Sequence, residues 1–176
     1  NPGTTKIVDQ NGDGEIKLDD DKIVYNRSPK HIFGMGHTFT YKDLSLSVQM
    51  YARLGGYINY SMNSMITYDN TNWGDIDYWT PENPNAKFQT PGTGQITYGS
   101  SLLWEKADYF KIKDITLSYN LPKKVLSKVG IYNARVYGSL KNYFTFSNID
   151  NYDPERGGAI SFPLQKQVVV GLNLQL

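Results

Sequence analysis

The fold class of this chain is decided by the stretch Lys166-Gln167-Val168-Val169-Val170-Gly171-Leu172-Asn173-Leu174-Gln175-Leu176. Side chains of a β-strand point to opposite faces in turn, so this stretch has one apolar face and one face that is polar except at Val169. Such alternation over about ten residues is typical of transmembrane β-barrels, where one face contacts lipid and the other contacts water. We therefore predict that the lipid-facing residues are Val168, Val170, Leu172, Leu174 and Leu176.

Composition excludes several other classes of protein. The 176 residues are enough for one domain, and a net charge of +1 gives no reason to expect a nucleic-acid partner. The absence of cysteine excludes disulfides, thiolate nucleophiles and cysteine-based zinc sites. The sequence has no apolar run of ~18 residues that would form a membrane helix. Aromatic residues make up 14%, which suits barrels and soluble binding modules alike.

Alternating apolar residues predict five strands. The clearest lie in a hairpin, in which a tight turn at 42–43 separates strands at 31–41 and 44–57. A later segment reads as a short helical turn, because Pro122 lies near its start and Gly130 near its end. In order, we predict an extracellular loop at 1–30, a strand hairpin at 31–57, a long extracellular loop at 58–107, a strand at 108–120, a periplasmic turn at 121–130, a strand at 131–146, an extracellular loop at 147–165 and a terminal strand at 166–176.

The lengths of the connections indicate how the strands are arranged. Long and short connections alternate, as in outer-membrane barrels with long extracellular loops and short periplasmic turns. Within 108–120 the apolar phase slips between Ile112 and Ile115, which predicts a β-bulge. Five strands cannot close a barrel, and unpaired strand edges are not tolerated in lipid. We therefore expect an all-β fold in which this chain is the C-terminal part of a longer barrel and does not fold alone.

Five motifs occur in order along nearly the whole chain. They are DQNGDGEI at 9–16 with the aspartates at 19–21, YWTPENPNA at 78–86, IKDITLSYNLP at 112–122, RVY at 135–137 with KNYFT at 141–145, and YDPE at 152–155. Together they resemble the SusC/RagA-type TonB-dependent outer-membrane transporters, the starch-utilisation-system family of Bacteroidota. The chain departs from that family at its last residue, because the family usually ends in Phe and Leu176 stands here.

The resemblance implies a fold and a function for the longer protein. The fold is a barrel of about 22 strands with an N-terminal plug, in the outer membrane of a Bacteroidota-like, Gram-negative bacterium. The function is TonB-driven import of oligosaccharides or peptides, to which this segment contributes wall and outer loops. The implied partners are a SusD-like surface lipoprotein, TonB acting through a plug outside this segment, the glycan or peptide, and outer-membrane lipid. Import of this kind requires no cofactor in this segment.

An acidic segment near the start matches the spacing of a calcium-binding loop. Asp9, Asn11, Asp13 and Asp20 occupy positions one, three, five and twelve, and Glu15 would offer its backbone carbonyl at position seven. Oxygen ligands at this spacing suit a structural Ca²⁺ ion. The alternative is a loop of Asx turns, in which the carboxylates accept hydrogen bonds from backbone N–H groups.

Aromatic residues gather in the long loop at 58–107. We regard Trp73, Tyr78, Trp79 and Trp104 as candidates for contact with a partner or a substrate. The alternative is a loop that folds on itself through its own aromatic side chains. We favour this internal packing, or a partner contact, over direct contact with substrate.

Other polar residues give weaker indications. His31 and His37 share one phase of a strand, and we interpret them as luminal or interface residues rather than a metal pair. Asp150, Asp153 and Glu155 lie within one loop, where we expect solvated acids rather than a catalytic carboxylate pair.

Two further classes of protein were compared with the transporter interpretation. The sequence has no Ser/His/Asp order, zinc signature or spaced carboxylate pair, so we expect no enzyme activity. The main alternative is a soluble calcium-dependent carbohydrate-binding module with a β-sandwich fold. That alternative explains neither the apolar ridge at 166–176 nor the alternating lengths of the loops.

Overall fold

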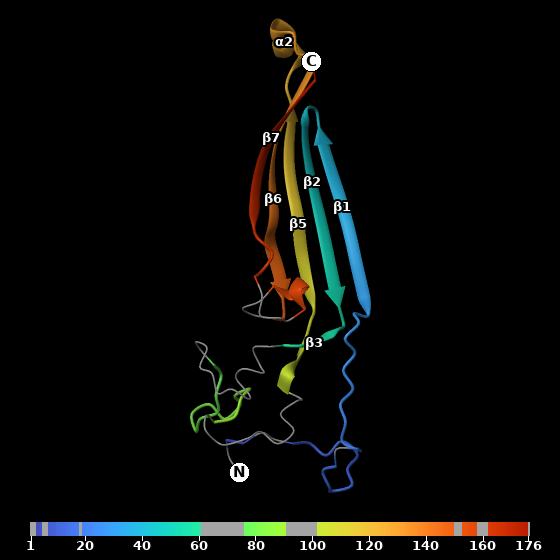
Figure 1. Cartoon of the computed structure of the whole chain (residues 1–176), viewed down its shortest axis with the longest axis vertical. Helices are drawn as coiled ribbons and strands as arrows, with labels where there is room; N and C mark the ends of the chain where they lie inside the picture. Colours follow the sequence, from blue (N-terminus) through green and yellow to red (C-terminus); the bar gives the residue numbers. More distant parts are fainter. Residues whose placement is uncertain are drawn as a thin grey trace.

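One long antiparallel sheet dominates the computed structural model, which describes residues 3–4, 7–17, 19–60, 76–90, 102–149, 153–157 and 162–175. Its five strands follow the order β1-β2-β5-β6-β7, and each lies beside the next along the chain, with the small β3–β4 pair apart from them (Figure 1). They are β1 (His31–Tyr41), β2 (Leu44–Leu54), β5 (Tyr109–Asn120), β6 (Asn133–Ser147) and β7 (Gln167–Gln175). The all-β prediction and the five antiparallel strands are confirmed.

The sheet has two chemically different faces. Residues paired across antiparallel strands lie on the same side of a sheet, so the register assigns each side chain to a face. The apolar face includes Phe33, Met35, Phe39, Leu46, Val48, Ile112, Ile115, Leu117, Val136, Leu140, Val168, Val170, Leu172 and Leu174. The polar face includes Ser45, Ser47, Gln49, Asp114, Thr116, Ser118, Arg135, Ser139, Lys141, Gln167 and Asn173. The alternation therefore continues through the whole sheet and is not a property of β7 alone.

A β-bulge in β5 explains the slip in apolar phase. The pairing with β2 shifts between Gln49 and Met50, and the pairing with β6 shifts between Ile112 and Asp114. Lys113 is the residue passed over in both registers. Because of the extra residue, Ile112 and Ile115 lie on the same apolar face although they are three positions apart, as the predicted bulge requires.

Short and long connections lie at opposite ends of the sheet (Figure 1). At one end, residues 42–43 join β1 to β2, while α2 (Lys123–Leu126) and η2 (Ser127–Val129) join β5 to β6. Gly130 ends η2 with φ 73°, a left-handed conformation that glycine adopts without strain. In the part of the chain that is described, no helix has the length and apolarity needed to cross a membrane.

The long connections contain structure that the sequence did not indicate. The predicted strand 44–57 is in fact two strands, because β2 ends at Leu54 and β3 (Tyr57–Asn59) follows. Strand β3 pairs with β4 (Trp104–Lys106) in a separate two-stranded sheet inside the segment expected to be a loop. Three-residue strands show no sustained alternation, so only their pairing across more than forty residues of sequence defines them.

The apolar face is exposed rather than covered by a second layer. Leu117 is 50% exposed and Phe39 is 62% exposed, although both lie in the interior of long strands. A β-sandwich would bury these side chains against a second sheet. Within the described residues, β1 and β7 each have one paired neighbour, so the outer edge of each strand has unpaired backbone groups. A larger closed sheet would satisfy both edges.

Candidate functional site

The apolar face forms one continuous hydrophobic surface across five strands. The predicted lipid-facing side chains of β7 are exposed: the exposed fraction is 62% for Val168, 82% for Val170, 55% for Leu172 and 53% for Leu174. Leu176 lies outside the described residues. An exposed apolar surface of this extent marks contact with a membrane or a partner, since soluble monomers rarely expose one.

The polar face is held together by hydrogen bonds between neighbouring strands. Asp114 on β5 accepts hydrogen bonds from Ser139 Oγ at 2.7 Å and from Thr116 Oγ1 at 2.5 Å. Arg135 on β6 donates to Ser118 Oγ at 2.6 Å, which again joins β6 to β5. These contacts fix polar side chains on the face opposite to the apolar surface, as a water-facing wall requires.

At the long-loop end of β5, two lysines reach two carboxylates of the segment 153–157, which we call the strap. Lys111 Nζ lies 2.8 Å from Glu155 Oε2 and 3.3 Å from Asp153 Oδ1. Lys113 Nζ lies 2.6 Å from Glu155 Oε1. The Lys111 side chain is only 1% exposed, and those of Asp153 and Glu155 are 8% and 14% exposed. The strap includes η3 (Pro154–Arg156) and is joined to β5 by these ion pairs.

The expectation that Asp153 and Glu155 are solvated acids is wrong. Burial raises the pKa of Asp153, but the backbone N–H groups of Leu164 and Glu155, together with Lys111, outweigh it and leave that pKa below its ordinary value. Burial likewise raises the pKa of Glu155, and hydrogen bonds from Lys111 and Lys113 bring it below its ordinary value. Both groups are therefore carboxylates engaged in fixed ion pairs. Asp150, the third acid considered, lies outside the described residues.

Sequence reasoning missed Lys111 as a partner of these acids. The two sides of the contact are 42 residues apart in the chain, and no local pattern links them. The available signal was weak: Lys111 falls on the polar phase of β5, and the loop after β6 is acidic.

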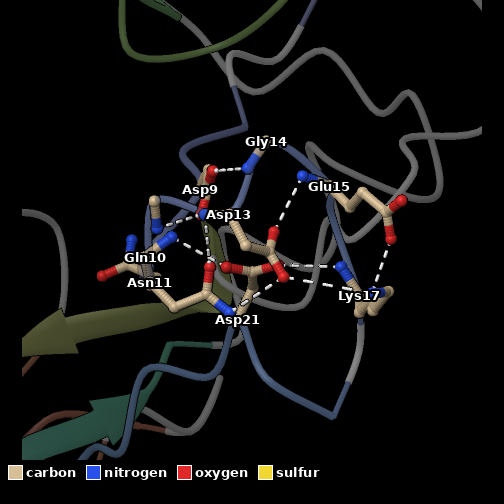
Figure 2. A network of polar contacts seen from close by, with 9 residues as sticks. Asp9, Gln10, Asn11, Asp13, Gly14, Glu15, Lys17 and Asp21 are labelled. Carbon is tan, nitrogen blue, oxygen red and sulfur yellow. Dashed lines mark hydrogen bonds and ion pairs between the residues drawn. The ribbon is translucent and has the colours of Figure 1, made fainter.

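The acidic segment 9–21 folds into a loop of side-chain caps, as Figure 2 shows. Asp9 accepts from the backbone N–H of Gly12 at 2.6 Å and of Gly14 at 2.8 Å. In the same way, the side-chain oxygens of Asn11 and Asp13 accept from the N–H groups of residues 13 and 15. Glu15 instead forms an ion pair with Lys17. This geometry is that of the Asx-turn alternative.

Asp21, which the calcium-loop spacing did not include, closes this loop through hydrogen bonds. Asp21 accepts from the backbone N–H of Gln10 at 2.7 Å and of Lys17 at 2.8 Å, and these hydrogen bonds lower its pKa. Asp20 is exposed, and the hydrogen bonds that close the loop go to Asp21 instead. No group of three or more acidic or histidine side chains is arranged around a common point in the described residues. Carboxylate oxygens have further lone pairs, so calcium binding stays a prediction.

The aromatic candidates among the described residues contact other residues of the long connections. Trp104 stacks on Tyr25, with ring centroids 5.6 Å apart and planes at 18°. The backbone N–H of Trp79 donates to Phe88, and Tyr78 forms an isolated bridge with the same residue. Trp73 lies outside the described residues. Contact of these residues with a partner or a substrate stays a prediction.

The two histidines lie on the apolar face of the sheet, which favours the interface interpretation over the luminal one. His37 pairs in register with Val48 and stacks on Phe39 at 6.0 Å, and His31 stacks on Phe33 at 6.1 Å. In the sequence, both histidines already alternate in step with Phe33 and Phe39, and this spacing predicts that all four side chains lie on the same face.

Comparisons with known proteins agree with this geometry. Two receptors of Formosa agariphila are similar to the chain: TonB-dependent receptor P3 is 29% identical over 88% of this chain, and TonB-dependent receptor P26 is 30% identical over 98% of it. The chain spans 16% and 19% of the length of these two receptors. No protein-family model matches.

Solved structures give the same result for the fold. The RagAB peptide transporter matches 91% of this chain and 19% of its own, with a TM-score of 0.72 and 24% identity. The RagAB peptide importer in its closed-closed state matches 97% of this chain and 20% of its own, with a TM-score of 0.71 and 25% identity. The apolar and polar faces of the sheet are thus those of a barrel wall, and the chain belongs to the SusC/RagA-type family of TonB-dependent receptors, as a segment of their β-barrel.

Proposed function

We propose that this chain is part of the wall of an outer-membrane barrel that imports a nutrient by a TonB-dependent route. The observation that carries the proposal is the division of one continuous sheet into an exposed apolar face and a hydrogen-bonded polar face. In this arrangement lipid contacts the apolar face and the wet lumen contacts the polar face. The segment then crosses the outer membrane several times, in a Gram-negative cell of the Bacteroidota type.

The long connections would lie outside the cell and the short ones in the periplasm. Residues 42–43 and the α2–η2 turn are at one end of the sheet, and β3, β4 and the strap are at the other (Figure 1). Outer-membrane barrels place short turns in the periplasm and longer loops outside. The outer loops are therefore the parts of this chain that a lid-like surface lipoprotein and an incoming solute would meet.

The solute is an oligosaccharide or a peptide. The solved relatives are named for peptide transport, and the Formosa receptors are named without a solute. TonB would act on a plug outside this segment, and a SusD-like lipoprotein would cover the barrel. The relatives are named as receptors and transporters, which supports import without bond chemistry. The residues of this chain would form a wall that separates lipid from water, and none would transfer a proton to the solute.

Detergent purification of the full-length receptor that contains this segment tests the proposal. We expect a surface lipoprotein to co-purify, and cells that lack either protein or TonB to lose uptake of the solute that the complex retains. Uptake that persists without TonB would contradict the proposal. A second test concerns the carbohydrate-module alternative: the segment expressed alone would then be soluble and monomeric without detergent, whereas a wall segment would not.

A further inference from the structure

The strap is joined to the wall by a compact set of ionic contacts. Lys111 contacts both carboxylates, whereas Lys113 contacts only the carboxylate of Glu155 and also lies over the ring of Tyr51 at 4.9 Å. Two positive and two negative charges are brought together, so the cluster is neutral. Lys113 is 43% exposed, whereas Lys111 is almost completely buried. Lys111 is therefore the only one of the two lysines that contacts both carboxylates of the strap, and it does so in a water-poor environment.

Asp153 also organises the strap internally. Its Oδ1 accepts from the backbone N–H of Glu155 at 3.1 Å, and its Oδ2 accepts from the backbone N–H of Leu164 at 2.9 Å. One carboxylate thus connects Lys111 on β5, the start of η3 and the chain that leads into β7. The ring of Tyr109, two residues before Lys111, is buried in the same region.

We infer that Lys111 is a positioning residue that fastens the 153–157 strap to the polar face, and that the strap is a fixed part of the outer mouth rather than a moving lid. Breaking a buried ion pair by removing one partner is strongly unfavourable, because the remaining charge is left without compensation in a medium of low polarity. Without Lys111, Asp153 would lose its cation, and Lys113 would remain bound only to Glu155. The inference goes beyond nutrient import and would stand if the solute or the partner were different.

Hydrogen exchange at two backbone amides tests the inference in the full-length receptor purified in detergent. The amides of Glu155 and Leu164 both donate to Asp153, so they report the strap directly. We expect Lys111→Met to accelerate their exchange roughly tenfold or more, and Lys113→Met to accelerate it only a few fold. Lys141→Met is the matched control, because Lys141 lies on the same face of β6 and pairs in register with Asp114. It should leave both amides unchanged.

A second variant keeps the test decisive if Lys111→Met fails to fold. Asp153→Asn keeps the size of the side chain and removes its charge, and it should also accelerate exchange at Leu164. In the double variant, the acceleration should be smaller than the product of the two single effects, because both changes break the same contact. The midpoint of the acid-induced loss of protection should also rise in Lys113→Met, since one cation that favours the ionised Glu155 is removed. Unchanged exchange in both Lys111→Met and Asp153→Asn would overturn the inference, and neither result depends on solute or TonB.

Discussion

Placing a charge on the apolar face of β7 should destabilise the folded barrel in a membrane. Val170 is the fourth of the nine residues of β7, and its side chain is 82% exposed. It therefore lies close to the middle of the strand and hence of the bilayer. Arginine at a lipid-facing midplane position costs about 2–4 kcal/mol. Because about 1.4 kcal/mol corresponds to a factor of ten, Val170→Arg should lower the folding equilibrium by about thirtyfold to about eight-hundredfold.

The neighbouring residue supplies a matched control. Val169 has the same side chain as Val170, and its depth in the bilayer differs from that of Val170 by at most about 3.4 Å, the rise of one strand residue. Unlike Val170, it lies on the polar face, where it pairs with Ser139. Val169→Arg should cost less than about 1 kcal/mol, because the guanidinium reaches water in the lumen. Asn173→Arg should behave in the same way. The assay is denaturant titration of the full-length receptor in lipid vesicles, followed by the change in electrophoretic mobility of the folded barrel. Equal costs for Val170→Arg and Val169→Arg would refute the facing assignment.

Three further predictions concern the strap, the acidic loop and the terminal strand. The folded pKa of Asp153 is below its unfolded value, so its stabilisation is present above the ordinary carboxylate pKa and is lost as the pH falls through the lowered value. Protection of the Leu164 amide, measured as its exchange rate relative to that of an unstructured peptide at the same pH, should persist at the ordinary carboxylate pKa and be lost below it. If the segment 9–21 binds calcium, Ca²⁺ should protect it from proteolysis relative to chelator, and identical cleavage would remove the metal interpretation. A methyl group at Gly171 would overlap the Tyr137 ring, so Gly171→Ala should cost about 1–2 kcal/mol in a denaturant titration, and a Tyr137→Ala background should relieve most of that cost.

Sequence alone predicted the long strands and their faces, because period-two alternation carries both kinds of information. The strand expected at 31–41 has the same bounds in β1, and the phase slip near Ile112 corresponds to the bulge at Lys113. The helical turn after Pro122 also occupies the expected place, since proline at the start and Gly130 at the end are local signals. These features depend on neighbours within a few residues.

Features that depend on distant residues were not predictable. The β3–β4 pair brings together segments separated by the long loop, and the strap reaches Lys111 from another part of the chain. The acids of the strap therefore looked solvated in the sequence although they are paired in the fold. The choice of Asp21 over Asp20 to close the acidic loop has a similar origin, because only the path of the backbone determines which carboxylate points inward.

The central claim is that hydrocarbon contacts one face of β7 and water contacts the other. Single cysteines placed in turn at residues 167–175 of the full-length receptor, each labelled with a nitroxide and reconstituted in lipid, measure this directly. The labels at 168, 170, 172 and 174 should collide with oxygen dissolved in the bilayer, and those at the alternate positions should collide with a water-soluble nickel complex. Loss of this two-residue period, or water contact at 170 and 172, would contradict the account.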